Sequence, residues 1–136
     1  MTTFQYARFQ YASDQSLMVY VGEEVDLETH HRVLKLLRML EAAPIPGVRN
    51  LHPAYCSLLI VFDPVEQEHA NIQRVVETYM ERLDTIPLPA PRTVEIPVHY
   101  GGEDGPDLAD LAGLHNMTPE RVIELHSSAS YIVYFV

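Results

Sequence analysis

The chain of 136 residues is long enough for one ordinary domain, or for a small domain followed by part of another. Its hydrophobic fraction of 47% and charged fraction of 21% are typical of a globular protein and argue against disorder. A formal net charge of −10 disfavours nucleic-acid binding, which needs clustered lysine and arginine, and no stretch holds the roughly 18 apolar residues of a membrane span. We therefore expect neither a nucleic acid nor a membrane as a partner.

The cysteine and histidine content gives little sign of redox or metal chemistry. Cys56 is the only cysteine, so an internal disulfide is excluded, and its place at the start of an apolar run predicts a small hydrophobe rather than a nucleophile. The seven histidines form no His-Glu-x-x-His pattern, and we expect no metal site. The N-terminal sequence MTTFQYARFQ lacks the features of a signal peptide, which predicts a cytoplasmic protein.

The first forty residues predict a β-hairpin followed by a helix. Aromatic residues mark a strand over Phe4–Tyr11, and alternating apolar residues mark a second strand over Leu17–Gly22. A helix is predicted over Asp26–Leu40, with Asp26 as its N-cap. Basic side chains are expected to form the polar side of this helix, namely His30, His31, Arg32, Lys35 and Arg38.

The next forty residues repeat this order. A strand begins over Val48–Leu51, and Pro53 predicts that it is interrupted or lies at a sheet edge. The apolar run Cys56–Phe62 predicts a central strand, and a regular apolar stripe predicts a helix over Gln67–Leu83. Residues 1–85 are therefore expected to form an α+β domain of order ββαββα, an antiparallel sheet with two helices on one face.

A proline-rich linker over residues 86–92 is predicted to separate this domain from a second part over residues 93–136. Alternating apolar residues predict a strand over Val94–Val98, and helices are predicted over Leu108–Leu114 and after the cap Thr118. The apolar run Tyr131–Val136 predicts a final strand. Such a strand would leave a sticky unpaired edge, so we expect the second domain to be incomplete, and a homodimer would cover the edge.

The loop after the predicted strand carries the polar groups of greatest interest. Gly101 and Gly102 introduce an acidic cluster, and Asp107 is placed to cap the next helix with Asp110 in a box-like position. A purely structural turn and a functional loop both fit this pattern. His126 ends the last predicted helix, where it either complements the helix dipole or faces the same cleft as the loop.

Several motifs resemble one known family. They are IPVHYGGEDGPDLADLA at 96–112, VIELHSSASYIVYF at 122–135, SLMVYVG at 16–22 and PAYCSLLIVFDP at 53–64. Taken in chain order, they resemble the family of the 5-oxoprolinase B subunit, also called allophanate hydrolase subunit 1 or KipI. The resemblance implies that the α+β domain precedes a cyclophilin-like β-barrel, of which this chain holds only the opening elements.

The resemblance also implies a function. The chain would be a non-autonomous subunit of an ATP-dependent amide hydrolase that opens 5-oxo-L-proline to L-glutamate with companion subunits of the A and C types. Under this hypothesis Glu103, Asp107 and His126 are the expected catalytic residues in a cleft shared with a companion subunit. The expected substrate contacts are His99, Tyr100, Gly101 and Gly102.

The same resemblance leaves other functions open. No phosphate-binding motif follows the glycines, so we expect no cofactor on this chain and ATP on the companion subunits. One alternative is a KipI-type inhibitor that binds a sensor histidine kinase through its acidic surface. Another is a subunit related to allophanate hydrolase or urea carboxylase.

Overall fold

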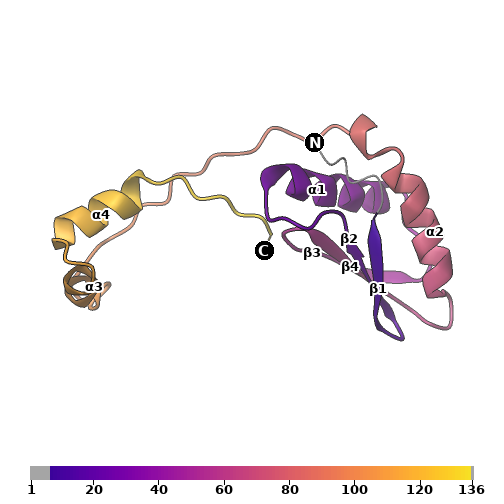
Figure 1. Cartoon of the computed structure of the whole chain (residues 1–136), viewed down its shortest axis with the longest axis horizontal. Coiled ribbons are helices and arrows are strands. Elements are labelled where there is room, and N and C mark those ends of the chain that lie inside the picture. Colours follow the sequence, from indigo (N-terminus) through magenta and orange to yellow (C-terminus); the bar gives the residue numbers. More distant parts are fainter. Residues whose placement is uncertain (1–6, 136) are drawn as a thin grey trace. The chain divides into compact units, whose positions relative to one another are not determined.

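The computed structural model describes residues 7–135, which fall into two units. The first unit comprises residues 7–90 together with Tyr134 and Phe135, and the second comprises Pro91–Val133. Figure 1 labels the elements of both units in chain order. Within residues 7–135 no helix combines the length and apolar character needed to cross a bilayer.

The first unit contains a four-stranded antiparallel sheet of order β1-β2-β4-β3. Its strands are β1 (Arg8–Ser13), β2 (Ser16–Tyr20), β3 (Val48–Pro53) and β4 (Ser57–Phe62). The two hairpins lie side by side, with β2 and β4 paired at the centre so that Leu17 faces Ile60 and Val19 faces Leu58. The predicted central strand is thus confirmed, and Pro53 lies on an edge strand, where its missing N–H costs no ladder bond.

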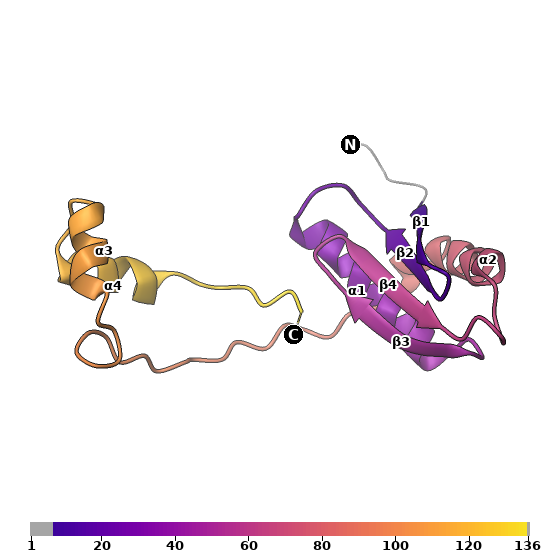
Figure 2. The same ribbon diagram turned by 90° about the horizontal axis from the view of Figure 1, so that it is seen from below.

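Helices α1 (Leu27–Ala42) and α2 (His69–Met80) cover the same face of this sheet, as Figures 1 and 2 show. Alternate strand residues point toward them, which is why every second side chain of β2 and β4 is buried. The core combines strand and helix residues that are at most 2% exposed, among them Leu17, Val19, Leu58, Ile60, Phe62, Val33, Leu36, Leu40, Ile72 and Val76. The predicted ββαββα domain with both helices on one face is confirmed.

The turn before α2 explains why this helix is shorter than predicted. The Asp63 carboxylate accepts a hydrogen bond from the Val65 N–H at 2.9 Å and forms an ion pair with Arg49 at 2.7 Å. The Arg49 hydrogen bond and the Val65 N–H hold the pKa of Asp63 below its ordinary value. Because this turn occupies the residues after Asp63, α2 begins at His69, and a 3₁₀ turn, η1 (Leu83–Thr85), replaces its predicted last turn.

His69 joins α2 to the first hairpin. Its Nε2 lies 2.8 Å from the Ser13 carbonyl oxygen and 3.3 Å from that of Ser16, so Nε2 must carry the proton that both oxygens accept. The ring also stacks on Tyr11, with centroids 4.0 Å apart, and meets Phe62 edge-on. Contacts between residues more than fifty positions apart leave no periodic signal, and the sequence did not predict this one.

His30 corrects the prediction that it lies on the polar side of α1. Its side chain is 4% exposed, and its ring meets the ring of Tyr134 edge-on at 4.7 Å between centroids. Tyr55 in turn contacts both Tyr134 and Phe135. Helical spacing cannot reveal a cover supplied from a hundred residues away, which is why the prediction was wrong.

The second unit contains helices α3 (Leu108–Leu114) and α4 (Pro119–Ser128), both at the predicted places. The Thr118 hydroxyl caps α4 by accepting the Arg121 N–H at 3.3 Å, and Pro119 is the first residue of α4, as predicted.

The predicted strand over Val94–Val98 is wrong, and residues 131–135 of the predicted final strand form none either. A strand needs a hydrogen-bonded neighbour, and the described part of the chain supplies none to these segments. Their apolar side chains are accordingly exposed, for example Ile96 at 77% and Val133 at 75%. Two predicted strand ends, Phe4 and Val136, lie outside the described residues.

The N-caps of α1 and α2 provide a matched test of the fold. The Asp26 carboxylate accepts the Thr29 N–H at 2.7 Å, whereas Glu68 at the same position of α2 makes no side-chain cap bond. Replacing Asp26 by Ala should therefore lower the free energy of unfolding by about 1 kcal/mol, because a helix N–H loses its acceptor. Glu68→Ala should change it by less than about 0.5 kcal/mol. Urea unfolding followed by circular dichroism measures both, and equal losses would contradict this account of the caps.

Candidate functional site

The glycine loop of the second unit closes on itself through its backbone. Gly101 and Gly102 have positive φ angles of 76° and 59°, the left-handed region that other residues enter only at a cost. The Gly105 N–H then donates to the Gly101 carbonyl oxygen at 3.1 Å, and the Leu108 N–H donates to the Gly105 carbonyl oxygen at 3.3 Å. The predicted glycine turn is present, and it leads directly into α3.

Two residues predicted to belong to one site do meet. The Tyr100 hydroxyl lies 2.7 Å from Nδ1 of His126, although 26 positions separate them, and the two rings meet edge-on at 5.7 Å between centroids. The Tyr131 hydroxyl donates to the His126 backbone carbonyl oxygen at 3.1 Å, and its ring lies 5.4 Å from the imidazole. We call Tyr100, His126 and Tyr131 the Tyr-His-Tyr cluster.

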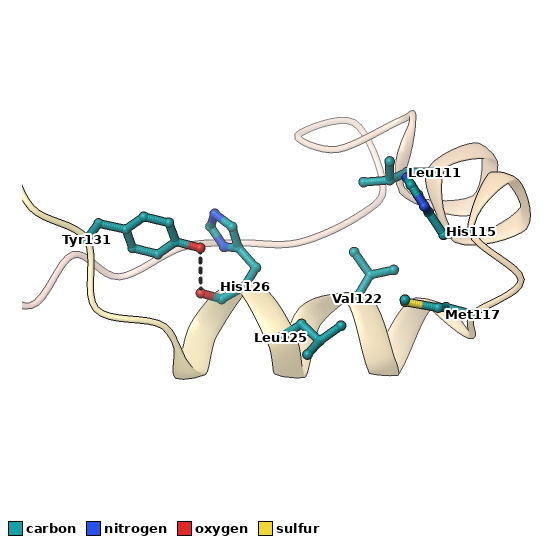
Figure 3. A pocket seen from close by; sticks show the side chains of 7 residues that line it. All are labelled: Leu111, His115, Met117, Val122, Leu125, His126 and Tyr131. Carbon is teal, nitrogen blue, oxygen red and sulfur yellow. Dashed lines mark hydrogen bonds between the residues drawn. The ribbon is translucent and has the colours of Figure 1, made fainter. Parts of the chain in front are cut away.

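His126 and Tyr131 of this cluster also line a pocket of about 370 Å³, drawn in Figure 3. His126 and Val122 rise from the same side of α4, as their spacing of four residues requires, and Leu111 and His115 face them from the end of α3. Leu125 and Met117 complete the lining. The pocket therefore offers a mostly apolar wall with two imidazoles and one phenol, a composition suited to a small organic ligand with a few polar groups.

His99 pairs with a carboxylate of its own loop, a contact that the sequence did not predict. Its Nδ1 lies 2.7 Å from Oδ2 of Asp104, and the two side chains are 77% and 68% exposed. A pair this exposed contributes little to stability. Asp104 belongs to the predicted acidic cluster but had no predicted role, because adjacency in sequence does not reveal which carboxylate turns toward the imidazole.

Glu103 and Asp107 are not joined to His126. Across residues 7–135 neither carboxylate makes a side-chain hydrogen bond or an ion pair, and neither lines the pocket. Asp107 is the N-cap residue of α3 as predicted, but the predicted side-chain cap is wrong, because its backbone has the helical angles φ −87° and ψ −2° rather than the extended ones a capping side chain needs. The catalytic roles of Glu103 and Asp107 stay predictions.

The pocket lining includes residues that the sequence did not assign to a site. The sequence predicted Tyr131 only as the first residue of a strand, and it gave no site role to the other newly found lining residues, namely Leu111, His115, Met117, Val122 and Leu125. The one signal in the sequence was that two short amphipathic helices follow each other closely, which favours contact between them without showing which residues frame a cavity. In the described part of the chain no three metal-binding side chains of His, Cys, Asp or Glu cluster together.

The pKa of one carboxyl group in the second unit is shifted. The pKa of Glu120 lies below its ordinary value because its own backbone N–H and the Thr118 hydroxyl hydrogen-bond to the carboxylate. Glu120 lies in the first turn of α4, whereas His126 lies in the last. A carboxylate in the first turn suits the helix dipole, and His126 lies in the last turn, where the sequence placed it.

Comparisons with known proteins agree on one family. Residues 7–136 match the family described as carboxyltransferase domain, subdomain C and D. A curated relative from Bacillus subtilis (strain 168), named as the B subunit of 5-oxoprolinase, is 32% identical over 133 residues, which cover 90% of this chain and 55% of the relative. This chain thus spans about half the length of that relative, and the resemblance noted from its motifs is confirmed.

Solved structures with a similar fold include proteins from different organisms. A conserved uncharacterized protein from Pyrococcus horikoshii, PH0987, is 31% identical with a TM-score of 0.53, over 94% of this chain and 58% of that one. The urea carboxylase of Kluyveromyces lactis is 23% identical with a TM-score of 0.54, over 57% of this chain and 7% of that one. At that identity the second likeness shows the fold alone.

Gly105 provides the test of the loop geometry. A Cβ at this position would lie 2.8 Å from the Gly101 backbone nitrogen, closer than real Cβ contacts. Gly105→Ala should therefore open the turn and speed amide hydrogen exchange at residues 105 and 108, measured by NMR. Gly113→Ala, where nothing lies within 4 Å, should leave these rates unchanged. Unchanged exchange in Gly105→Ala would contradict the described turn.

Proposed function

The chain belongs to the carboxyltransferase-domain family of subdomains C and D, and on this basis we propose that it is a non-autonomous subunit of an ATP-dependent amide hydrolase. The proposed reaction is that of a 5-oxoprolinase, the opening of 5-oxo-L-proline to L-glutamate. Support comes from curated relatives that are named as the 5-oxoprolinase B subunit. The observation that carries the proposal is the Tyr-His-Tyr cluster, which sets an imidazole at the edge of a pocket large enough for a small cyclic amide.

The chemistry of the pocket fits this class of substrate. The apolar side chains of Leu111, Val122 and Leu125 can accommodate the methylene groups of a five-membered ring. An imidazole beside them can donate a hydrogen bond to an amide oxygen or transfer a proton during ring opening. His126 is therefore the residue to which we assign the central polar role.

The remaining site residues require a companion subunit in this proposal. Glu103 and Asp107 are solvent-facing carboxylates on the glycine loop, and we assign their action to a cleft shared with that subunit. His99 and the backbone of Gly101 and Gly102 are the proposed further contacts of the substrate. Because the relatives are named as one lettered subunit of an enzyme, their names support an assembly with companions of the A and C types.

In this proposal a companion subunit, and not this chain, binds ATP. The loop after Tyr100 has no Gly-Lys-Ser/Thr sequence to hold a phosphate chain, so we assign ATP binding to a companion. ATP hydrolysis supplies the driving force for opening an amide that is otherwise stable, and this chain contributes substrate-facing side chains.

Reconstitution tests this function. The chain is purified with the products of its neighbouring genes, and ATP-dependent release of glutamate from 5-oxo-L-proline is measured with and without it. Activity should require the chain. His126→Ala should lower kcat/KM by about 10²–10⁴-fold, the usual contribution of a general acid or base. The matched control is His52→Ala, which removes an exposed histidine of the edge strand β3 and should leave activity unchanged.

Two results would contradict the proposal. One is full activity of the companions without this chain, and the other is full activity of the complex that contains His126→Ala. If no complex forms and the chain instead slows autophosphorylation of a sensor histidine kinase, the inhibitor alternative replaces the hydrolase function.

A further inference from the structure

We propose that Tyr100 is a positioning residue, whose hydroxyl donates to Nδ1 of His126 and holds the imidazole as the tautomer protonated on Nε2. The sequence predicted that Tyr100 contacts the substrate, but the pocket lining includes His126 and not Tyr100. Tyr100 contacts the His126 ring without lining the pocket, which favours action through the ring. The assignment of a tautomer is independent of the proposed function, whereas the ligand group that it selects rests on that function.

Two hydrogen bonds hold His126, one at its ring and one at its backbone. The Tyr100 oxygen lies 2.7 Å from Nδ1, a short hydrogen bond, and the Tyr131 hydroxyl holds the backbone of the same residue at 3.1 Å. Tyr100 is half-buried and follows directly on the extended segment that enters the glycine turn. The turn therefore sets where this hydroxyl lies, and the hydroxyl sets how the ring is turned.

The direction of the hydrogen bond follows from the two groups. A phenol offers one O–H donor, and a neutral imidazole offers one N–H donor and one bare nitrogen that accepts. The hydrogen bond made by one ring nitrogen decides where the ring proton resides. The bare nitrogen is the stronger acceptor of the two groups and the phenol the stronger donor, so Tyr100 donates to Nδ1 and the ring proton resides on Nε2.

This tautomer determines what the pocket can recognise. With Nδ1 occupied by Tyr100, the remaining polar group of the ring is the Nε2–H, which is a donor and requires an acceptor. The ligand group that fits is an oxygen without a hydrogen, such as an amide carbonyl or a carboxylate. On the proposed function, it is the carbonyl oxygen of the cyclic amide, where negative charge develops as the ring opens.

The ¹⁵N resonances of His126 in the full chain test the tautomer without substrate or companions. In the native protein we expect separate signals for a bare Nδ1 and a protonated Nε2. Tyr100→Phe removes only the hydroxyl, and the two signals should move toward each other as the second tautomer becomes populated. Tyr131→Phe is the matched control, because its hydroxyl binds the backbone and not the ring, and the signals should stay in place.

The positioning role of Tyr100 and the class of ligand are tested by different measurements, so each can fail without the other. Signals that are the same in Tyr100→Phe and the native protein, or a native Nδ1 that carries the proton, would overturn the positioning role. The ligand class is tested in the assembled complex by adding 5-oxo-L-proline, and L-proline, which lacks the ring carbonyl, as its control. A shift of the Nε2 signal with 5-oxo-L-proline alone supports carbonyl recognition, whereas no shift overturns it and leaves the tautomer result standing.

Discussion

Burial of one face of the sheet is the constraint on which the first unit depends. The paired central strands β2 and β4 place Leu17, Val19, Leu58 and Ile60 on this face, and α1 and α2 remove it from water. Because side chains alternate along a strand, a shift of one residue in the register would turn this whole set toward solvent. The register of the β2–β4 pair and the apolar faces of α1 and α2 therefore stabilise each other. At the edge strand β3 the contributions are local, namely Pro53 and the ion pair between Arg49 and Asp63.

The second unit has no comparable core among its described residues, where Ala112 is the one side chain that is fully buried. Specific polar and aromatic contacts order its site instead, namely the closed glycine turn and the Tyr-His-Tyr cluster. Its apolar side chains remain largely exposed. This contrast supports our proposal that the site acts only in an assembly, because a companion that covers the exposed side chains would also exclude water from His126.

The two units differ in how well sequence predicted them, for a physical reason. Strand alternation, helix stripes and caps such as Asp26 and Thr118 are local signals, and they placed most of the fold. The strand predicted over Val94–Val98 failed because apolar alternation indicates only that a strand can form, whereas pairing needs a neighbour. The Tyr100–His126 contact was anticipated only as a shared cleft, and the cover of His30 was missed, because both depend on residues distant in sequence.

Hydrogen–deuterium exchange of the chain, alone and mixed with its companion subunits, is the sharpest test of where the functional surface lies. Our proposed function puts that surface on the glycine loop and the Tyr-His-Tyr cluster of the second unit, facing a companion. We predict slower exchange in the complex at residues 99–107 and 122–131, because the companion covers them. Exchange that stays unchanged there, or protection confined to the sheet and helices of the first unit, would contradict this placement.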